Sequence, residues 1–243
     1  MLDVRLCLLV ALMLSAPVTS TAQLLPPPPP PPPPPSAAPV QKLSETTYRV
    51  GQLRIDVARR ELVAPGTLND VTLLEFVANT KDGAKAYESA ITIDSNAVTF
   101  NTALLLLGLD TKRGVASTRQ FDPATPKGDP VDVFVTFTLN GGERTMRVEE
   151  LLLDNRTGKT VPSGPWVYTG STFIGTGAER RYLAELDGVL IGLMHGPQAI
   201  IENPRNDAVE GYGMVVMNSK LGLPAGTPVT VTIRALPSPF QPR

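Results

Sequence analysis

The chain has 243 residues, a formal net charge of −1 at pH 7, and basic and acidic residues mixed along its length. Because this balance leaves no basic stripe to follow a phosphate backbone, we expect no nucleic-acid partner. Beyond the N-terminal segment no apolar run reaches about 18 residues, so we expect no further membrane span.

The first 22 residues have the pattern of a secretory signal peptide. A short apolar run, Leu6–Leu14, follows Arg5, and Ser20 and Ala22 place small residues at the cleavage positions. The run is too short to cross a hydrocarbon layer of ~30 Å, which takes about 20 residues. We expect cleavage after Ala22 and a periplasmic or secreted mature chain. The weakly charged start leaves an uncleaved N-terminal membrane anchor as the alternative.

Residues 23–41 form a proline-rich, low-complexity segment that contains ten consecutive prolines from Pro26 to Pro35. Such a run forms a polyproline II rod, which at ~3.1 Å per residue spans about 31 Å. The segment lacks the apolar periodicity needed to join a core. We therefore expect a disordered spacer, and a chain starting near Leu43 that unfolds at nearly the same temperature.

Residues 42–243 are predicted to form a single mostly β domain of the α+β class, with antiparallel sheets or a sandwich and one buried helix near 96–107. Alternation of apolar and polar residues predicts most of the strands. In chain order these strands are 48–50, 53–57, 59–63, 71–79, 85–94, 131–139, 143–153, 166–168, 171–174, 182–186, 189–194 and 229–235.

Three turns connect these strands in the sequence pattern. Pro65-Gly66 ends the first meander, and Lys81–Gly83 is expected to join two strands as a hairpin. Asn140–Gly142 makes the clearest hairpin turn of the chain.

One helix is strongly indicated. Asn96 is an N-cap candidate, Phe100 and Leu104 recur at helical spacing, and Gly108 is placed to end the helix. The apolar run 104–107 predicts burial on more than one side. A second short helix is expected over 198–202, after Pro197.

The connection from Gly114 to Pro130 is long and rich in proline and glycine. Loops of this length without regular structure are either mobile or functional. Both possibilities stay open for this segment.

Most catalytic and metal-binding patterns are missing from the sequence. His195 is the only histidine, which excludes a site built on two histidines within one chain. The only cysteine, Cys7, is lost on signal cleavage, so the mature chain has no thiolate site for a metal or an iron–sulfur cluster. We expect no metal and no cofactor.

The candidate ligand-binding residues are polar or amphipathic side chains that stand inside apolar or turn-forming segments. Each also has a structural interpretation: a tryptophan in a core, or a histidine that bonds a turn carbonyl at a strand end. We expect Glu88, Trp166, Ser171 and His195 to share one surface or cleft. The candidates are Glu88, Trp166, Tyr168, Ser171, Asp187 and His195.

Several blocks occur together in a recognisable order: Tyr87-Glu88-Ser89, 103–109, 130–133, 150–152, 165–171 and 195–204. In this order the chain resembles the YdjY-domain family over residues 71–236. The resemblance implies a bacterial exported protein of largely unknown function. Tyr87 and Thr102 stand where relatives often have histidine, which removes two potential metal ligands. The label ferredoxin-like, given to some members, does not carry over, because the cysteines are missing.

Three functions remain open. The first is a non-catalytic binding or interaction domain, presented on the polyproline spacer to an envelope protein or polymer. The second is a carboxylate-dependent enzyme in which Glu88, Asp187 and His195 act as acid or base. The third is a structural component whose proline segment is the working part.

Overall fold

The computed structural model describes residues 36–205 and 211–238, and the signal peptide and most of the proline-rich segment predicted for residues 1–35 lie outside them. The strands are β1 (Val40–Lys42), β2 (Thr47–Val50), β3 (Leu53–Asp56), β4 (Glu61–Leu68), β5 (Leu73–Leu74), β6 (Phe76–Thr80), β7 (Ser89–Ile93), β8 (Asp129–Leu139), β9 (Gly142–Arg147), β10 (Leu152–Asp154), β11 (Trp166–Tyr168), β12 (Phe173–Ile174), β13 (Arg181–Tyr182), β14 (Val189–Gly192), β15 (Ile201–Glu202), β16 (Val215–Met217) and β17 (Pro228–Ala235). The helices are α1 (Ala97–Leu106), α2 (Leu183–Asp187) and the 3₁₀ turns η1 (Ala86–Glu88), η2 (Thr111–Arg113), η3 (Val148–Leu151), η4 (Gly177–Glu179) and η6 (Ser219–Leu221).

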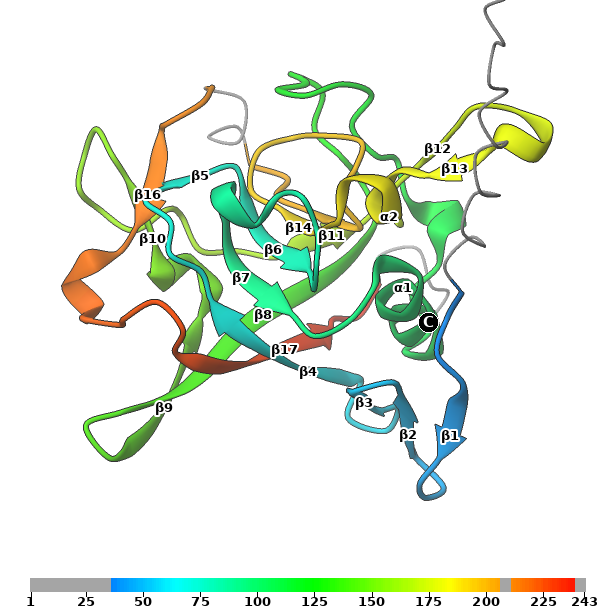
Figure 1. Cartoon of the computed structure of the whole chain (residues 1–243). Coiled ribbons are helices and arrows are strands. Elements are labelled where there is room, and N and C mark those ends of the chain that lie inside the picture. The colour runs from blue at the N-terminus through cyan, green and yellow to red at the C-terminus, as the bar shows by residue number, and fades with distance from the viewer. Residues whose placement is uncertain (1–35, 206–210, 239–243) are drawn as a thin grey trace, which may run out of the picture. The chain divides into compact units, whose positions relative to one another are not determined.

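Eight strands close into a β-barrel in the order β4-β17-β8-β11-β15-β14-β6-β7, and β7 pairs back onto β4 (Figure 1). The mostly β prediction is confirmed, whereas open antiparallel sheets or a sandwich are wrong. Two of the pairs, β6–β7 and β14–β15, are parallel. Pairing between strands distant in sequence closes the barrel, and local periodicity carries no signal for it.

The closure runs through Pro65-Gly66, which the sequence predicted to be a turn. Both residues lie inside β4, at the point where its edge leaves β3 and takes up pairing with β7. A Cβ atom at Gly66 would lie 2.8 Å from the carbonyl oxygen of Thr92 on β7. Glycine is needed here because the two backbones approach so closely.

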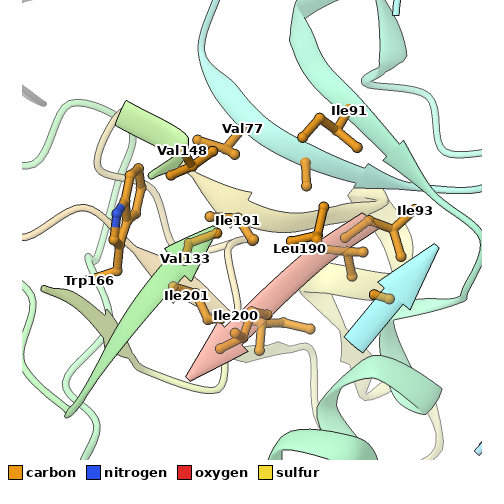
Figure 2. Close-up of a cluster of buried hydrophobic side chains, with 14 of the residues drawn as sticks. Val77, Ile91, Ile93, Val133, Val148, Trp166, Leu190, Ile191, Ile200 and Ile201 are labelled. Carbon is orange, nitrogen blue, oxygen red and sulfur yellow. The ribbon is translucent and has the colours of Figure 1, made fainter. Parts of the chain in front are cut away.

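The barrel interior is filled by one cluster of apolar side chains. On β8 the inward positions Val131, Val133 and Val135 are fully buried, at the predicted period of two. Figure 2 shows Val133, Ile191 and Ile201 gathered in this cluster. Burial of each such side chain contributes about 1.5–3 kcal/mol to stability.

The predicted helix is confirmed as α1. The Asn96 side chain accepts a hydrogen bond from Thr99 N at 2.7 Å, and the Glu185 carboxylate of α2 accepts one from Ala97 N at 2.8 Å. Phe100 and Leu104 are fully buried. Leu105, in contrast, is 45% exposed, so the expectation of burial on more than one side is wrong for this residue.

Two predictions in the 71–94 region are wrong. Residues 71–79 are not one strand, because the chain changes sheets at Glu75: β5 pairs with β16, and β6 belongs to the barrel. Lys81–Gly83 is not a hairpin turn, since β6 and β7 are parallel. Residues 86–88 form η1, so the predicted strand 85–94 is reduced to β7.

Two short elements also differ from the predictions. Residues 183–187 form α2, which ends at Gly188 with φ +70°, where a strand was expected. The segment 198–202 contains strand β15 in place of the predicted helix, because Ile201 and Glu202 pair with both β11 and β14. At 201–202 tertiary pairing overrides local propensity, whereas residues 183–187 are mostly good helix formers.

The ordered contacts of the barrel begin before the predicted boundary at residue 42. Ala38 N donates to Thr99 Oγ1 at 3.0 Å, and β1 pairs with β2 over Val40–Lys42. The end of the predicted spacer is thus attached to α1 and the sheet. Over the described ranges, no helix has the length and apolar character to cross a membrane.

Candidate functional site

A groove of about 870 Å³ lies where the chain leaves β11. Four segments form its walls: one side of α1, the loop 111–118, residues 169–174, and the end of the β12–β13 hairpin. We call it the hydroxyl groove, because its lining includes the side chains of Thr111, Ser117, Thr118, Thr169, Ser171 and Thr172.

Close backbone contacts fix the walls of the hydroxyl groove. A Cβ atom at Gly128 would lie 2.0 Å from the carbonyl oxygen of Tyr168, and one at Gly114 would lie 2.6 Å from that of Thr169. The long loop predicted from sequence therefore packs its glycines directly on the end of β11. The groove is shaped by main-chain atoms, which do not rearrange as freely as side chains.

Ser171 is the one sequence candidate that lines the groove. It has φ +60°, a left-handed conformation that is uncommon for a residue with a Cβ atom. Its hydroxyl lies 3.0 Å from the carbonyl oxygen of Pro197 and 3.1 Å from that of Gln198, to which it donates. Such strained positions cluster at functional sites.

Other hydroxyls of the groove also have partners inside the protein. Ser117 donates to the buried carboxylate of Glu202, and Thr118 donates to Asp122 at 2.6 Å. Burial raises the pKa of Glu202, and the Ser117 bonds oppose that rise. The bonds from Thr118 and from the amide of Ala124 lower the pKa of Asp122. The exposed Thr118 hydroxyl therefore keeps lone pairs, rather than its proton, available to a ligand, whereas Ser117 is buried.

The β12–β13 hairpin brings a cation and apolar side chains to the groove. The guanidinium of Arg180 lies 4.1 Å from the ring centre of Phe173. Phe173 is 51% exposed and Ile174 is 43% exposed. Phe173 also contacts the ring of Tyr182, whose hydroxyl donates to Gly170 O at 2.9 Å.

Tyr168 lies beneath the groove and is fully buried. Its hydroxyl donates to Asn101 Oδ1 at 2.6 Å, and Asn101 lines the groove from α1. Burial raises the pKa of Tyr168, with the charges of Asp110 and Asp129 adding to the effect. The tyrosine thus supports the α1 wall as a neutral hydrogen-bond donor.

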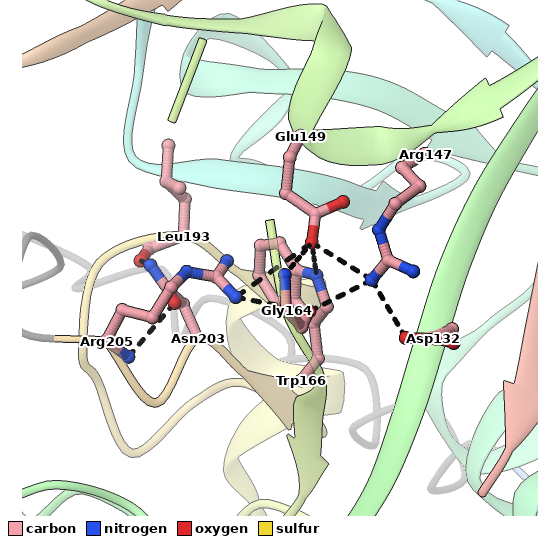
Figure 3. A network of polar contacts seen from close by, with 8 residues as sticks. All are labelled: Asp132, Arg147, Glu149, Gly164, Trp166, Leu193, Asn203 and Arg205. Atoms are coloured by element: carbon pink, nitrogen blue, oxygen red, sulfur yellow. Dashed lines mark hydrogen bonds and ion pairs between the residues drawn. The ribbon is translucent and has the colours of Figure 1, made fainter. Parts of the chain in front are cut away.

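Trp166 belongs to a different polar network at another part of the barrel, shown in Figure 3. Its indole Nε1 donates to Glu149 Oε1 at 3.1 Å, and Gly164 N donates to the same oxygen at 3.2 Å. Arg147 Nη2 lies 3.3 Å and Arg205 Nη1 lies 3.9 Å from that oxygen. We call Arg147, Glu149, Trp166 and Arg205 the Glu149 cluster.

The Glu149 carboxylate is fully buried, so its charge depends on these partners. The bond to Asp132 and the charge of Glu149 raise the pKa of Arg147. Sequence reasoning missed this carboxylate. A charged residue between Val148 and Leu151 in an apolar run was the available signal.

Glu88 and Asp187 come together around a lysine. Lys85 Nζ lies 2.7 Å from Glu88 Oε1, and the bond raises the pKa of Lys85. Burial raises the pKa of Asp187 while Lys85 lowers it. Burial and the charge of Glu88 raise the pKa of Glu75, whose Oε2 accepts from Gln120 Nε2 at 2.6 Å. We call Glu75, Lys85, Glu88 and Asp187 the Lys85 cluster.

His195 is 1% exposed, and its Nδ1 lies 2.7 Å from the carbonyl oxygen of Asp122. Phe121 N donates to the carbonyl oxygen of His195, so the histidine holds the long loop at two points. Nε2 has no hydrogen-bond partner within the described ranges. This geometry agrees with a histidine that bonds a turn carbonyl.

The six sequence candidates are therefore distributed over several places. Ser171 lines the hydroxyl groove, Tyr168 supports its wall, and Trp166 is part of the Glu149 cluster. Glu88 and Asp187 share Lys85. A role of these residues in ligand binding stays a prediction. Arg180 and Asn101 were missed, because only the folded chain brings them to Ser171.

The family model of the YdjY domain matches residues 53–234, which is most of the chain. No curated protein and no solved structure matches it. The matched range contains all eight barrel strands except the last residue of β17, together with α1 and all four walls of the hydroxyl groove.

Proposed function

The chain belongs to the YdjY-domain family, and we propose that it is an exported, non-catalytic binding domain of the cell envelope. Its ligand lies in the hydroxyl groove, and its partner is an envelope protein or polymer. The observation that carries this proposal is the groove itself, whose walls are fixed by backbone contacts at Gly114 and Gly128.

A groove with fixed walls favours binding, because little conformational entropy is lost when a ligand enters it. Small-molecule and polymer sites are typically concave, mostly preformed, and lined by apolar groups with a few directed polar ones. The exposed apolar side chains of Leu105, Phe173 and Ile174 next to the threonine and serine hydroxyls fit this description.

The side chains of Ser171, Glu88 and His195 each have a partner inside the protein. A serine nucleophile needs a base within about 2.6–3.2 Å, and the Ser171 hydroxyl donates to backbone carbonyls instead. His195 is buried against Asp122 O, and Glu88 is paired with Lys85. The alternative of an enzyme that uses Glu88, Asp187 and His195 therefore has weaker support than a binding domain.

Export is supported by the sequence of residues 1–22, which lie outside the described ranges. N-terminal sequencing of the protein from its native host tests it. We expect a chain that begins at Gln23 in the periplasmic or secreted fraction. A membrane-retained product that still begins at Met1 contradicts cleavage and supports the anchor.

Binding in the groove is tested with two variants that fill it from opposite walls. Leu105→Trp on α1 and Ala116→Trp on the loop 111–118 both place an indole in the groove. Leu186→Trp is the matched control, because Leu186 is 58% exposed on α2 and lies outside the lining. Thermal unfolding of all three variants verifies that they fold.

The probes for calorimetry are muropeptides and neutral and acidic tetrasaccharides, with the mature chain from Gln23 onward. We expect at least one probe to bind the wild type and Leu186→Trp with equal affinity, and each groove variant at least about tenfold more weakly. The proposal fails if no probe binds, or if the folded groove variants bind as tightly as the wild type.

A further inference from the structure

We propose that the hydroxyl groove selects an acidic saccharide, a sugar chain that carries a carboxylate, and that Arg180 binds this carboxylate. The inference rests on the proposed function, since it names the class of ligand for the same groove. Three properties of the lining carry it: an available cation, a wall of hydroxyl acceptors, and small apolar surfaces between them.

Arg180 is the one cation among the described residues in the lining of the groove. It forms no ion pair with any residue in the described ranges, and no carboxylate from those ranges lines the groove. Its guanidinium packs on the face of the Phe173 ring. This contact fixes the plane of the guanidinium and leaves the N–H groups at its edge available. A guanidinium fixed in this way suits bidentate binding of a carboxylate. The neighbouring Arg181 differs, because its Nη1 donates to the carbonyl oxygens of Ala178 and Arg180.

The hydroxyl wall matches a ligand that has many O–H groups. Thr118 and Ser171 donate their protons inside the protein, so they offer lone pairs to the groove. The Thr111 and Thr172 hydroxyls have no hydrogen bond to another described side chain or backbone atom, and they serve as donors or acceptors. A saccharide both donates and accepts at every hydroxyl, so it satisfies a wall of this kind.

Apolar side chains separate these polar groups. Leu105, Ile174 and Pro197 line the same groove, and Leu105 and Ile174 are each more than 40% exposed. The C–H faces of a sugar ring cover such surfaces while its hydroxyls reach the neighbouring threonines. A ligand with both kinds of surface removes this apolar area from water without leaving polar groups unpaired.

Charge argues against the main competitor among large anions. A nucleic acid needs a row of basic side chains along its phosphates, and the chain as a whole carries a net charge of −1. An acidic peptide competes for the same guanidinium. Its backbone presents one N–H donor per residue, which is fewer than the hydrogen bonds that the hydroxyl wall can accept. An acidic peptide therefore serves as a separate probe.

The test uses calorimetry on the mature chain with three probes: tetragalacturonate, its methyl ester, and tetraglutamate. The ester has the same sugar skeleton without the charge. Arg180→Gln removes the cation from the groove. Arg144→Gln is the matched control, because Arg144 lies on β9, away from the groove, and has no ion pair among the described residues.

We expect tetragalacturonate to bind at least about tenfold more tightly than its ester or tetraglutamate. Arg180→Gln should reduce the preference over the ester to about twofold, and Arg144→Gln should leave it unchanged. Raising the salt concentration should weaken wild-type binding and have little effect on Arg180→Gln.

The alternative outcomes separate this inference from the proposed function. If the ester binds as tightly as the acid and Leu105→Trp abolishes both, the acidic-ligand inference is wrong and the groove remains the binding site. If tetraglutamate binds as tightly as tetragalacturonate, the saccharide class is wrong. If Leu105→Trp and Ala116→Trp bind tetragalacturonate as well as the wild type, both proposals fail.

Discussion

The Glu149 cluster and the hydroxyl groove use the same kinds of side chain in opposite ways. In the cluster a fully buried carboxylate is surrounded by two arginines, an indole N–H and a backbone amide. In the groove Arg180 lies over an exposed ring and forms no ion pair with any described residue, and no described carboxylate lines the groove. The comparison separates a charge that is compensated inside the protein from a charge at a fixed surface that is suited to a ligand.

The strongest test of this comparison removes the central carboxylate of the Glu149 cluster. Glu149→Ala removes the carboxylate that Arg147 and Arg205 share beside Trp166, and leaves both guanidinium groups bonded to Gly164 O. We expect the free energy of unfolding to fall by about 3–5 kcal/mol, the usual cost of breaking a buried ion pair. Urea denaturation measures the change.

Glu143→Ala on β9 is the control for that variant. Glu143 is exposed, so its replacement should change stability by less than about 0.5 kcal/mol. A loss below about 1 kcal/mol for Glu149→Ala would show that the cluster contributes little, and the contrast with the groove would disappear.

The next test concerns the attachment of α1, which forms one wall of the groove. A chain beginning at Leu43 lacks β1 and the bond from Ala38 N to Thr99 Oγ1. Loss of these few bonds should cost about 1–2 kcal/mol and lower the melting temperature by about 3–6 °C.

A chain beginning at Ser36 retains these contacts and is the matched comparison. We expect it to melt at the same temperature as the mature chain from Gln23. Equal melting temperatures for the chains that begin at Ser36 and Leu43 would show that α1 does not depend on β1. The folded domain would then begin near residue 42, as the sequence predicts.

A smaller effect is expected where the groove rests on the barrel. Tyr168→Phe removes the donor to Asn101 Oδ1 beneath the α1 wall and should cost about 1 kcal/mol. Tyr48→Phe is the control, because the Tyr48 hydroxyl has no hydrogen bond to another described residue. An equal loss in both variants would mean that the Asn101 bond adds nothing to the wall.

Local features of the fold were predictable from sequence, and closure of the barrel was not. The hairpin around Asn140 and the helix capped by Asn96 depend on residues close in the chain. The pairing of Gly66 with Ile93, and the parallel pairing of β6 with β7, join segments whose partners leave no local signal. A glycine such as Gly66 is common both in turns and where two strands approach closely, and the sequence alone does not distinguish the two cases.

The candidate site divides in the same way. Ser171 was found because a serine follows glycine inside an otherwise apolar and turn-forming block. Arg180 and Asn101 are ordinary surface residues in the sequence, and only the hairpin β12–β13 and helix α1 bring them to Ser171. The Glu149 cluster has a sequence signal of its own, the acidic pair Glu149-Glu150 between Val148 and Leu151, but only the folded chain shows that Glu149 is the buried one.

In the Lys85 cluster the charges are only partly compensated, because three carboxylates share one lysine. It is therefore intermediate between the Glu149 cluster and the hydroxyl groove, and the variant with the smallest expected effect lies here. Burial, with the charge of Glu88 added, raises the pKa of Glu75 above its usual value near 4.5. The native state therefore binds a proton more readily than the unfolded state. As a result, the contribution of Glu75 to stability falls as the pH rises above about 4.5.

Glu75→Gln removes this pH dependence. The free energy of unfolding of the variant, relative to that of the wild type, should therefore increase from pH 4 to pH 7. Urea denaturation at both pH values measures the difference, with Glu143→Gln as an exposed control that should show no such trend. A difference that stays constant or decreases would show that Lys85 and Gln120 compensate the carboxylate fully, as the arginines do for Glu149.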